Sequence, residues 1–159
     1  MPRPLLLDNT VLSNLAVVER VDLVFRVWPD RAMTTRQVLR EYELAEDAGL
    51  LPQQAWVNLP LVEMTPDEIA FSETLSPRLG AGERSCLAVA HARGGLFVSD
   101  DADARAMARR LGIHVSGTLG VLILATRRGY LTLREANALL AEMIALGYHS
   151  PVSELDTFI

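Results

Sequence analysis

Acidic residues follow two short apolar segments of the sequence, at positions where a β-strand would end. Asp8 comes directly after residues 5–7, all of which are leucine. Residues 96–98 are followed, after Ser99, by a cluster of three acids: Asp100, Asp101 and Asp103. In parallel α/β sheets, ligand sites form beyond the carboxyl ends of strands, and clustered carboxylates there repel one another unless a cation or protons intervene. Alternatively, these acids only cap the helices that follow, because Asp is common at helix N-termini.

Two glutamates occur in segments with helical periodicity. A predicted helix extends to about Ala48, with Thr34 and Thr35 as its cap, and Glu41 lies next to the core-facing side of that helix. A partly buried glutamate is usually paired or bound to something, although solvated glutamates are commoner. Glu83 opens a later helix, where an acid also simply favours the helix dipole. Both glutamates are therefore site candidates with a structural alternative.

A cluster of carboxylates without histidine or cysteine predicts a hard divalent cation. Mg²⁺ and Mn²⁺ prefer carboxylate oxygens and keep several waters, whereas zinc favours His and Cys ligands. The histidines of the chain show no ligand spacing, and its single cysteine, Cys86, lies in an apolar helical pattern typical of a core residue. A site of carboxylates and a divalent ion can activate water and stabilise charge on a phosphate during in-line displacement. The acids therefore predict metal-dependent phosphate chemistry.

The segments that would position these acids alternate between short strands and helices. The predicted strands are short and mostly apolar: 5–7, 32–33, 96–98 and 113–115. The predicted helices lie between and after them: 11–21, 35–48, 65–75, one opening at 83, 104–111, 118–128 and 133–146. This alternation indicates an α/β fold whose parallel sheet is covered by helices on both faces. Absence of repeats and linkers predicts one domain over residues 1–159, with a core of about 5–147 and a C-terminal tail of 148–159.

Three segments allow more than one interpretation. Residues 23–28 either continue the preceding helix or form a separate apolar packing segment. Residues 56–59 and 61–62 are short β-like pieces in a proline-punctuated stretch, and the tail can add one helical turn.

The composition limits the classes of function that fit. The chain has 159 residues and a net charge of −5, which argues against binding nucleic acid by bulk attraction. Setting aside the six negative charges of the candidate acids leaves +1 for the remaining residues. All fifteen basic residues are arginine, so every mechanism that requires lysine is excluded. The longest apolar run is too short to span a bilayer and no signal-peptide pattern is present, so we expect a cytoplasmic protein with no membrane association.

Four segments, in order, resemble the motifs of PIN domains. Leu5-Leu-Leu-Asp-Asn-Thr-Val-Leu-Ser-Asn-Leu15 is similar to the opening motif, and Val38-Leu-Arg-Glu-Tyr42 to the second. Gly82-Glu-Arg-Ser-Cys-Leu-Ala-Val-Ala90 resembles the third motif and Val98-Ser-Asp-Asp-Ala-Asp103 the fourth. The paired Asp-Asp and the later Gly117-Thr-Leu-Gly120 resemble one branch of the family. Each motif is degenerate by itself, but four in order are fairly specific.

The resemblance implies a three-layer α/β/α fold and a Mg²⁺- or Mn²⁺-dependent ribonuclease. Many members are toxins that a small antitoxin protein neutralises, and they are commonly homodimers. The acidic core of the family corresponds to four residues here: Asp8, Glu41, Glu83 and Asp101. Asp103 corresponds to a variable further acid, Ser99 to the family's Thr or Ser near the site, and Asp100 falls where many members carry Asn.

Roles follow from the chemistry of these groups. Asp8 and Asp101 would be direct metal ligands, while Glu41 and Glu83 would hold metal-bound waters or a second ion, and one of them would accept the proton of the attacking water. Ser99 would orient a carboxylate. The residues that could contact RNA phosphates are Asn9, Thr10, Arg84, Arg105 and Arg109. Alternatively, the arginines are solvated helix residues.

Two alternative interpretations of the sequence can be distinguished from a PIN-domain ribonuclease. A phosphatase of the haloacid dehalogenase type also begins with a strand ending in Asp, but it expects a second Asp where Thr10 stands and usually a lysine. The non-enzymatic rival is a catalytically silent PIN-fold module that binds RNA or a protein. Retention of all four acids argues against it, because unused clustered carboxylates cost stability.

Overall fold

A parallel sheet of four short strands forms the centre of the molecule. The computed structural model describes residues 3–54, 56 and 59–159, and its strands are ordered β2-β1-β3-β4. Their bounds are Leu5–Leu7 for β1, Ala32–Met33 for β2, Leu96–Val98 for β3 and His114–Ser116 for β4. Leu7 lies opposite Val98, which lies opposite Ser116. The strands therefore end level with one another, and the residues that follow them meet at one edge of the sheet.

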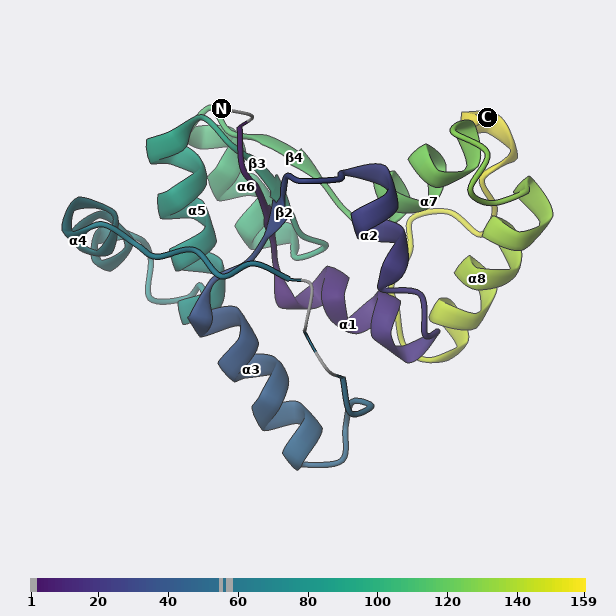
Figure 1. Ribbon diagram of the computed structural model, residues 1–159, viewed down its shortest axis with the longest axis horizontal. Coiled ribbons are helices and arrows are strands. Elements are labelled where there is room, and N and C mark those ends of the chain that lie inside the picture. Colours follow the sequence, from purple (N-terminus) through teal and green to yellow (C-terminus); the bar gives the residue numbers. More distant parts are fainter. Residues whose placement is uncertain (1–2, 55, 57–58) are drawn as a thin grey trace.

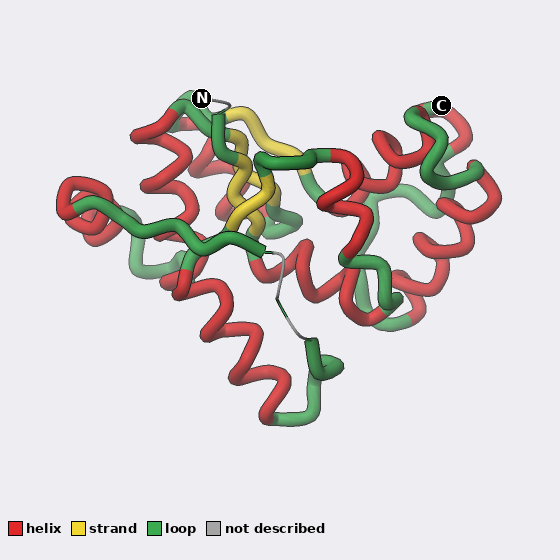
Figure 2. The backbone as a smooth tube through the Cα atoms, viewed as in Figure 1, coloured by secondary structure: helices red, strands yellow, loops and turns green. Residues whose placement is uncertain are grey.

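Helices connect the strands and form the outer layers. Those of the first half are α1 (Asn9–Val17), α2 (Asp22–Val27), α3 (Arg36–Asp47) and α4 (Pro66–Thr74). Those of the second half are α5 (Ala81–Arg93), α6 (Ala102–Arg110), α7 (Thr118–Arg127), α8 (Leu133–Ala145) and the 3₁₀ turn η1 (Asp156–Phe158). In Figure 1 the strands lie between α5 and α4 on one side and α2, α7 and α8 on the other. Figure 2 shows the strands confined to the centre of a mostly helical chain. The predicted α/β class with helices on both faces is confirmed.

The strands are buried because their side chains pack against helices on both faces. Every residue of β1 is fully buried, as are Phe97 and Val98 of β3. Helix α5 packs on both strands, and its buried residues include Cys86, as predicted for a core cysteine. Continuous apolar strands of this kind are typical of parallel sheets.

Local caps begin the helices that carry the acids. Asp8 caps α1 by accepting from Asn9 N, and Asp101 caps α6 by accepting from Ala104 N. Of the two predicted cap residues, Thr34 and Thr35, it is Thr35 that caps α3, by accepting from Val38 N. Asp8 and Asp101 are thus helix caps. Whether they also belong to a functional site depends on the surroundings of their other carboxylate oxygens.

The predicted single helix over residues 11–21 is wrong. Helix α1 ends at Val17, and Glu19 adopts a left-handed conformation with φ 57°. Glu19 N and Arg20 N donate back to the carbonyls of Ala16 and Leu15, which closes the helix in a Schellman turn. Because no glycine marks this turn, apolar periodicity runs through it unbroken in the sequence. The apolar segment 23–28 consequently forms its own helix, α2, rather than a continuation.

Other boundaries differ slightly from prediction. The fourth strand is shifted by one residue from 113–115, and α5 begins at Ala81 rather than Glu83. The predicted β-like piece 56–59 includes residues 57 and 58, which lie outside the described residues, whereas Leu61 forms a parallel bridge with Thr34 beside β2. The extra turn expected in the tail is η1. Among the described residues, no helix combines the length and apolarity that crossing a membrane requires.

Candidate active site

Asp8 is held in a buried position at the end of β1. Only 1% of its surface is exposed. One carboxylate oxygen accepts from Asn9 N at 2.8 Å, and the other accepts from the hydroxyls of Ser99 at 2.6 Å and Thr10 at 3.2 Å. These donors compensate part of the cost of burying a charge and fix the direction of the carboxylate.

Ser99 connects the ends of the two central strands. Its buried hydroxyl donates to Asp8 and accepts from Asp101 N at 3.1 Å. Asp101 Oδ2 in turn accepts from Ala104 N at 2.8 Å, while Oδ1 accepts no hydrogen bond from a described residue. Among side chains of this size, one with a hydroxyl group can both donate a hydrogen bond to Asp8 and accept one from Asp101 N. Ser99 therefore orients Asp8 directly and positions the backbone that carries Asp101.

Glu41 reaches the site from α3 and is anchored by the start of α5. Its Oε1 accepts from Gly82 N at 2.9 Å, and its Oε2 accepts no hydrogen bond from a described residue. A Cβ atom at Gly82 would lie 2.7 Å from Oε2 of Glu41 and 3.0 Å from Val38 Cγ2. Gly82 is therefore required by the close approach of the Glu41 carboxylate. The two helices are further joined by a 2.7 Å hydrogen bond between the hydroxyls of Thr35 and Ser85.

The raised pKa of Glu83 indicates that Asp8, Glu41, Glu83 and Asp101 share one electrostatic environment. Burial, followed by the nearby charges of Asp8, Asp101 and Glu41, raises the pKa of Glu83 to about 7. Burial raises the pKa of Asp8 to about 6, against the lowering effect of its hydrogen bonds to Ser99, Asn9 and Thr10. Like charges that raise each other's pKa are relieved by a proton or by a cation. The structure thus brings together acids that are up to 93 positions apart in the chain.

The donor set fits a hard divalent ion. All four groups are carboxylates: Asp8 and Asp101 follow strands, Glu83 lies in the first turn of α5 and Glu41 in the middle of α3. The partnerless oxygens of Glu41 and Asp101 leave donors for a cation or its waters. Among the described residues, no three His, Cys, Asp or Glu side chains enclose a metal position. Mg²⁺ commonly binds through one or two carboxylates and keeps its remaining waters, so the residues present are chemically suited to it.

Asp103 and Asp100 lie apart from this group in different ways. Asp103 is exposed in the first turn of α6. Asp100 is engaged by other partners: Oδ1 accepts from Thr118 N at 2.8 Å, and Oδ2 accepts from the Thr118 hydroxyl and from Asn14 Nδ2. Asp100 therefore joins α1 to the start of α7.

The predicted RNA-contacting residues occupy varied positions. Thr10 is part of the carboxylate frame, because its hydroxyl also accepts from Asp100 N at 2.9 Å. Arg105 Nη1 donates to the carbonyls of Ser99 and Ser116, both at 2.9 Å, and so ties the ends of β3 and β4. Arg109 is exposed on α6. Arg84 follows Glu83 on α5, and its buried Nε has no partner among the described residues.

Sequence reasoning missed three residues that shape the site. Gly82 accommodates Glu41, while Asn14 and Thr118 hold Asp100. A signal existed for two of them, since Gly82 directly precedes Glu83 and Thr118 begins a predicted helix. Asn14 carried no such signal, because its partner lies 86 residues away in the chain.

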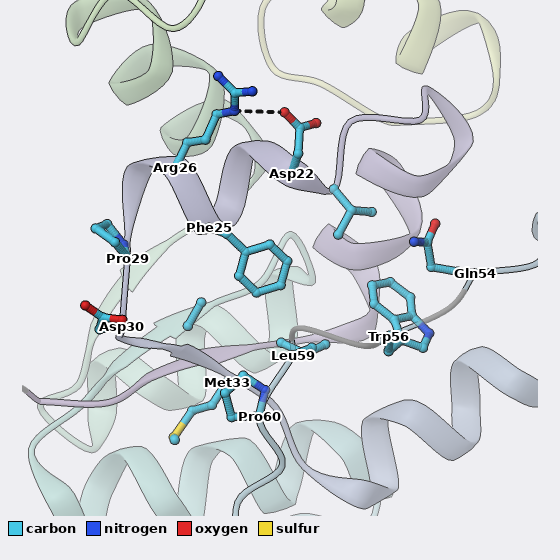
Figure 3. Close-up of a pocket in the computed structure, with 12 residues that line it drawn as sticks. Asp22, Phe25, Arg26, Pro29, Asp30, Met33, Gln54, Trp56, Leu59 and Pro60 are labelled. Atoms are coloured by element: carbon cyan, nitrogen blue, oxygen red, sulfur yellow. Dashed lines mark ion pairs between the residues drawn. The ribbon is translucent and has the colours of Figure 1, made fainter.

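A large, mainly apolar cavity lies elsewhere. It has a volume of about 850 Å³ and is lined mainly by apolar residues of α2 and β2, together with Trp56, Leu59 and Pro60. Figure 3 shows Phe25, Trp56 and Leu59 facing this hollow, with the ion pair of Arg26 and Asp22 at its border. None of the candidate acids lines it. Size and apolarity therefore do not mark the acidic site, which is recognised by its charges.

Comparison with known proteins identifies the family. Neither a comparison with curated proteins nor one with solved structures gave a significant match. The sequence model of a family described as a PIN domain matches residues 5–159, which is almost the whole chain. The match agrees with the parallel sheet flanked by helices and with the order of the acidic motifs. The chain belongs to the PIN-domain family, whose members are generally nucleases that typically use divalent metal ions.

Proposed function

We propose that this chain is a Mg²⁺- or Mn²⁺-dependent endoribonuclease that hydrolyses phosphodiester bonds of RNA. The observation that carries the proposal is the convergence of Asp8, Glu41, Glu83 and Asp101 on one electrostatic environment. Four separate segments contribute these acids, and the mutual repulsion of their charges lowers the stability of the folded protein. A bound cation explains why such an arrangement is retained.

In this proposal the four acids have distinct roles. Asp8 and Asp101 would hold the ion directly, Asp8 in the orientation set by Ser99 and Asp101 through the oxygen that does not cap α6. Glu41 would hold a metal-bound water with its partnerless oxygen, and Asp103 would act only at the rim, through water. When bound, the ion would acidify a water and neutralise charge on the phosphate.

Glu83 is the proposed proton acceptor. In the metal-free protein, burial and the neighbouring carboxylates raise its pKa to about 7, so this carboxylate takes up a proton more readily than an ordinary glutamate, as a general base must. It lies in the first turn of α5, beside Arg84, whose buried Nε is a donor without a partner among the described residues. We propose that Arg84 pairs with a phosphate oxygen and so offsets the negative charge of the site toward RNA.

The test is cleavage of a labelled single-stranded RNA of mixed sequence. We expect cutting in Mn²⁺ or Mg²⁺ that EDTA abolishes and that added metal restores. A metal-bound, folded protein that cuts no RNA from a set of varied sequences and hairpins would contradict the proposal. The non-cutting module that binds RNA or protein would then be favoured.

The resemblance to toxin components extends the proposal to partners. We propose a small antitoxin protein and a homodimer in the cytoplasm. Large apolar side chains that are mainly exposed, such as Leu44 and Leu50 at the end of α3, offer surface for such contacts. Light scattering of the purified protein measures the dimer, and a monomer at all concentrations contradicts it.

The raised pKa values predict how stability depends on pH and metal. Because the folded protein holds protons on Asp8 and Glu83 that the unfolded chain releases at lower pH, the metal-free protein should lose stability from about pH 4 to about pH 7. The shift at Asp8 alone corresponds to about 3 kcal/mol. Metal binding needs ionised carboxylates, so Mn²⁺ should raise the melting temperature strongly at pH 8 and little at pH 5. Thermal melts across this range, with and without Mn²⁺, measure both trends, and equal Mn²⁺ effects at both pH values would contradict them.

A further inference from the structure

A second cavity opens at the same edge of the sheet as the acids. It has a volume of about 490 Å³ and lies at the carboxyl end of β4, between α6, the start of α7 and the turn after α8. The residues that matter here are Asp100, Arg105, Arg109, Leu119, Tyr148 and His149. We call this cavity the β4 cleft. Because adjacent strands are about 5 Å apart, the cleft begins about one strand spacing from the end of β3, where Asp101 follows.

The wall formed by α6 carries positive charge. Arg105 is fixed by its two bonds to strand-end carbonyls, which holds its guanidinium at the inner wall. Arg109, one turn later, has no hydrogen-bond or ion-pair partner among the described residues. The carboxylate in the cleft, Asp100, already accepts from Thr118 and Asn14 with both oxygens. The cleft thus presents an arginine that is available to an anion.

The opposite wall carries aromatic rings. Tyr148 is partly buried and lies near Asp100 and Arg105, and burial together with the charge of Asp100 raises the pKa of its hydroxyl. His149 is exposed at the rim, and Leu119 adds an apolar surface. Bases of single-stranded nucleic acids stack on such rings, while arginines pair with their phosphates.

We propose that the β4 cleft binds one nucleotide of single-stranded RNA next to the scissile phosphate, with the base stacked on Tyr148 and its phosphate paired with Arg109. The inference rests on the proposed ribonuclease function and names the substrate class of that site. A cavity of this volume falls within the range of small-ligand pockets. A stacked duplex cannot place a base in it without unpairing, so the cleft selects single strands.

Binding without cleavage tests the cleft separately from catalysis. Fluorescence anisotropy of a labelled single-stranded RNA in EDTA should show about fivefold to tenfold weaker binding for Arg109→Ala. The slope of log binding constant against log salt concentration should become shallower by about one, because one phosphate contact is lost. Arg110→Ala is the matched control, because Arg110 is the next exposed arginine of α6 and does not line the cleft. It should change affinity less than about twofold.

Tyrosine variants separate stacking from folding. Tyr148→Leu should weaken binding about tenfold because it removes the ring face, whereas Tyr148→Phe should bind like the native protein. In a series of RNAs with one abasic position each, a single position should weaken binding to native protein and have no effect in Tyr148→Leu. Melting temperatures show whether Tyr148→Leu is folded. If it is not, Arg109→Ala and the abasic RNA series on the native protein test the cleft.

The outcomes distinguish the two proposals. Weaker binding of both cleft variants without any cleavage by the native protein supports the cleft and contradicts the ribonuclease. Cleavage with unchanged affinity in Arg109→Ala and Tyr148→Leu contradicts the cleft and leaves the ribonuclease standing. Equal affinity for duplex and single-stranded RNA, or no RNA binding in EDTA, also overturns the cleft.

Discussion

Asp8→Asn is expected to reduce metal-dependent RNA cleavage at least about a thousandfold while making the metal-free protein more stable at pH 8. The loss of activity follows because a neutral amide replaces the buried carboxylate that we propose as a direct ligand, and a metal ion supplies several kcal/mol of transition-state stabilisation. The shape of the side chain is retained, and its remaining oxygen can still accept from Asn9 N. Activity should therefore fall without a loss of fold.

The gain in stability has a separate cause. At pH 8 the native protein must keep a charge on a group whose folded pKa is about 6, and burial is the main reason for that value. Removing the charge should stabilise the metal-free protein by about 1 to 3 kcal/mol at pH 8. At pH 4, where Asp8 is mostly protonated in the folded protein, the variant and the native protein should melt alike. The stabilisation by Mn²⁺ at pH 8 should largely disappear in the variant.

Asp47→Asn is the matched control, because Asp47 is exposed at the end of α3 and far in sequence from every candidate acid except Glu41. It should retain native cleavage and native melting. Cleavage by Asp8→Asn within about tenfold of the native rate would show that Asp8 is only a helix cap. Parallel melts with and without metal would then also show no loss of Mn²⁺ binding.

Gly82→Ala is expected to lower kcat about tenfold to a hundredfold with little change in melting temperature. A Cβ at this position would lie 2.7 Å from Oε2 of Glu41, so the carboxylate must move. The end of a glutamate side chain moves at low cost, which spares the fold, but a displacement of about 1 Å of a catalytic group can cost about a hundredfold in rate. The contact with Val38 Cγ2 at 3.0 Å limits how far the helices can adjust.

Gly80→Ala provides a graded comparison. Its Cβ would lie 3.3 Å from Oε1 of Glu41, which is a milder contact. The kcat of Gly80→Ala should therefore lie between the native value and that of Gly82→Ala. The double variant Gly82→Ala with Glu41→Gln should be no slower than Glu41→Gln alone, because both changes act through one carboxylate. Full additivity of the two effects would contradict the role assigned to Gly82.

Much of the fold could be predicted from local patterns. Apolar runs at 5–7 and 96–98 predicted strands because parallel strands buried on both faces need continuous apolar side chains. Thr35 predicted a helix start because a cap is a contact between residues three positions apart. The break after Val17 was missed because Glu19 takes a left-handed conformation that the sequence does not announce. Local signals therefore predicted the elements wherever the determining contact was itself local.

In the candidate site, too, some features follow from local sequence and others only from tertiary contacts. The sequence by itself determined which acids follow predicted strands and which lie in predicted helices, and it predicted that these carboxylates bind a hard divalent cation. Only the tertiary structure decided that Glu41 rests on Gly82, that Asp100 is engaged by Asn14 and Thr118, and that a cleft with Tyr148 opens beside them. Such contacts join residues up to 104 positions apart and depend on how helices pack on the sheet. Periodicity and capping describe the neighbours of a residue along the chain, whereas burial and charge at a site depend on its neighbours in space.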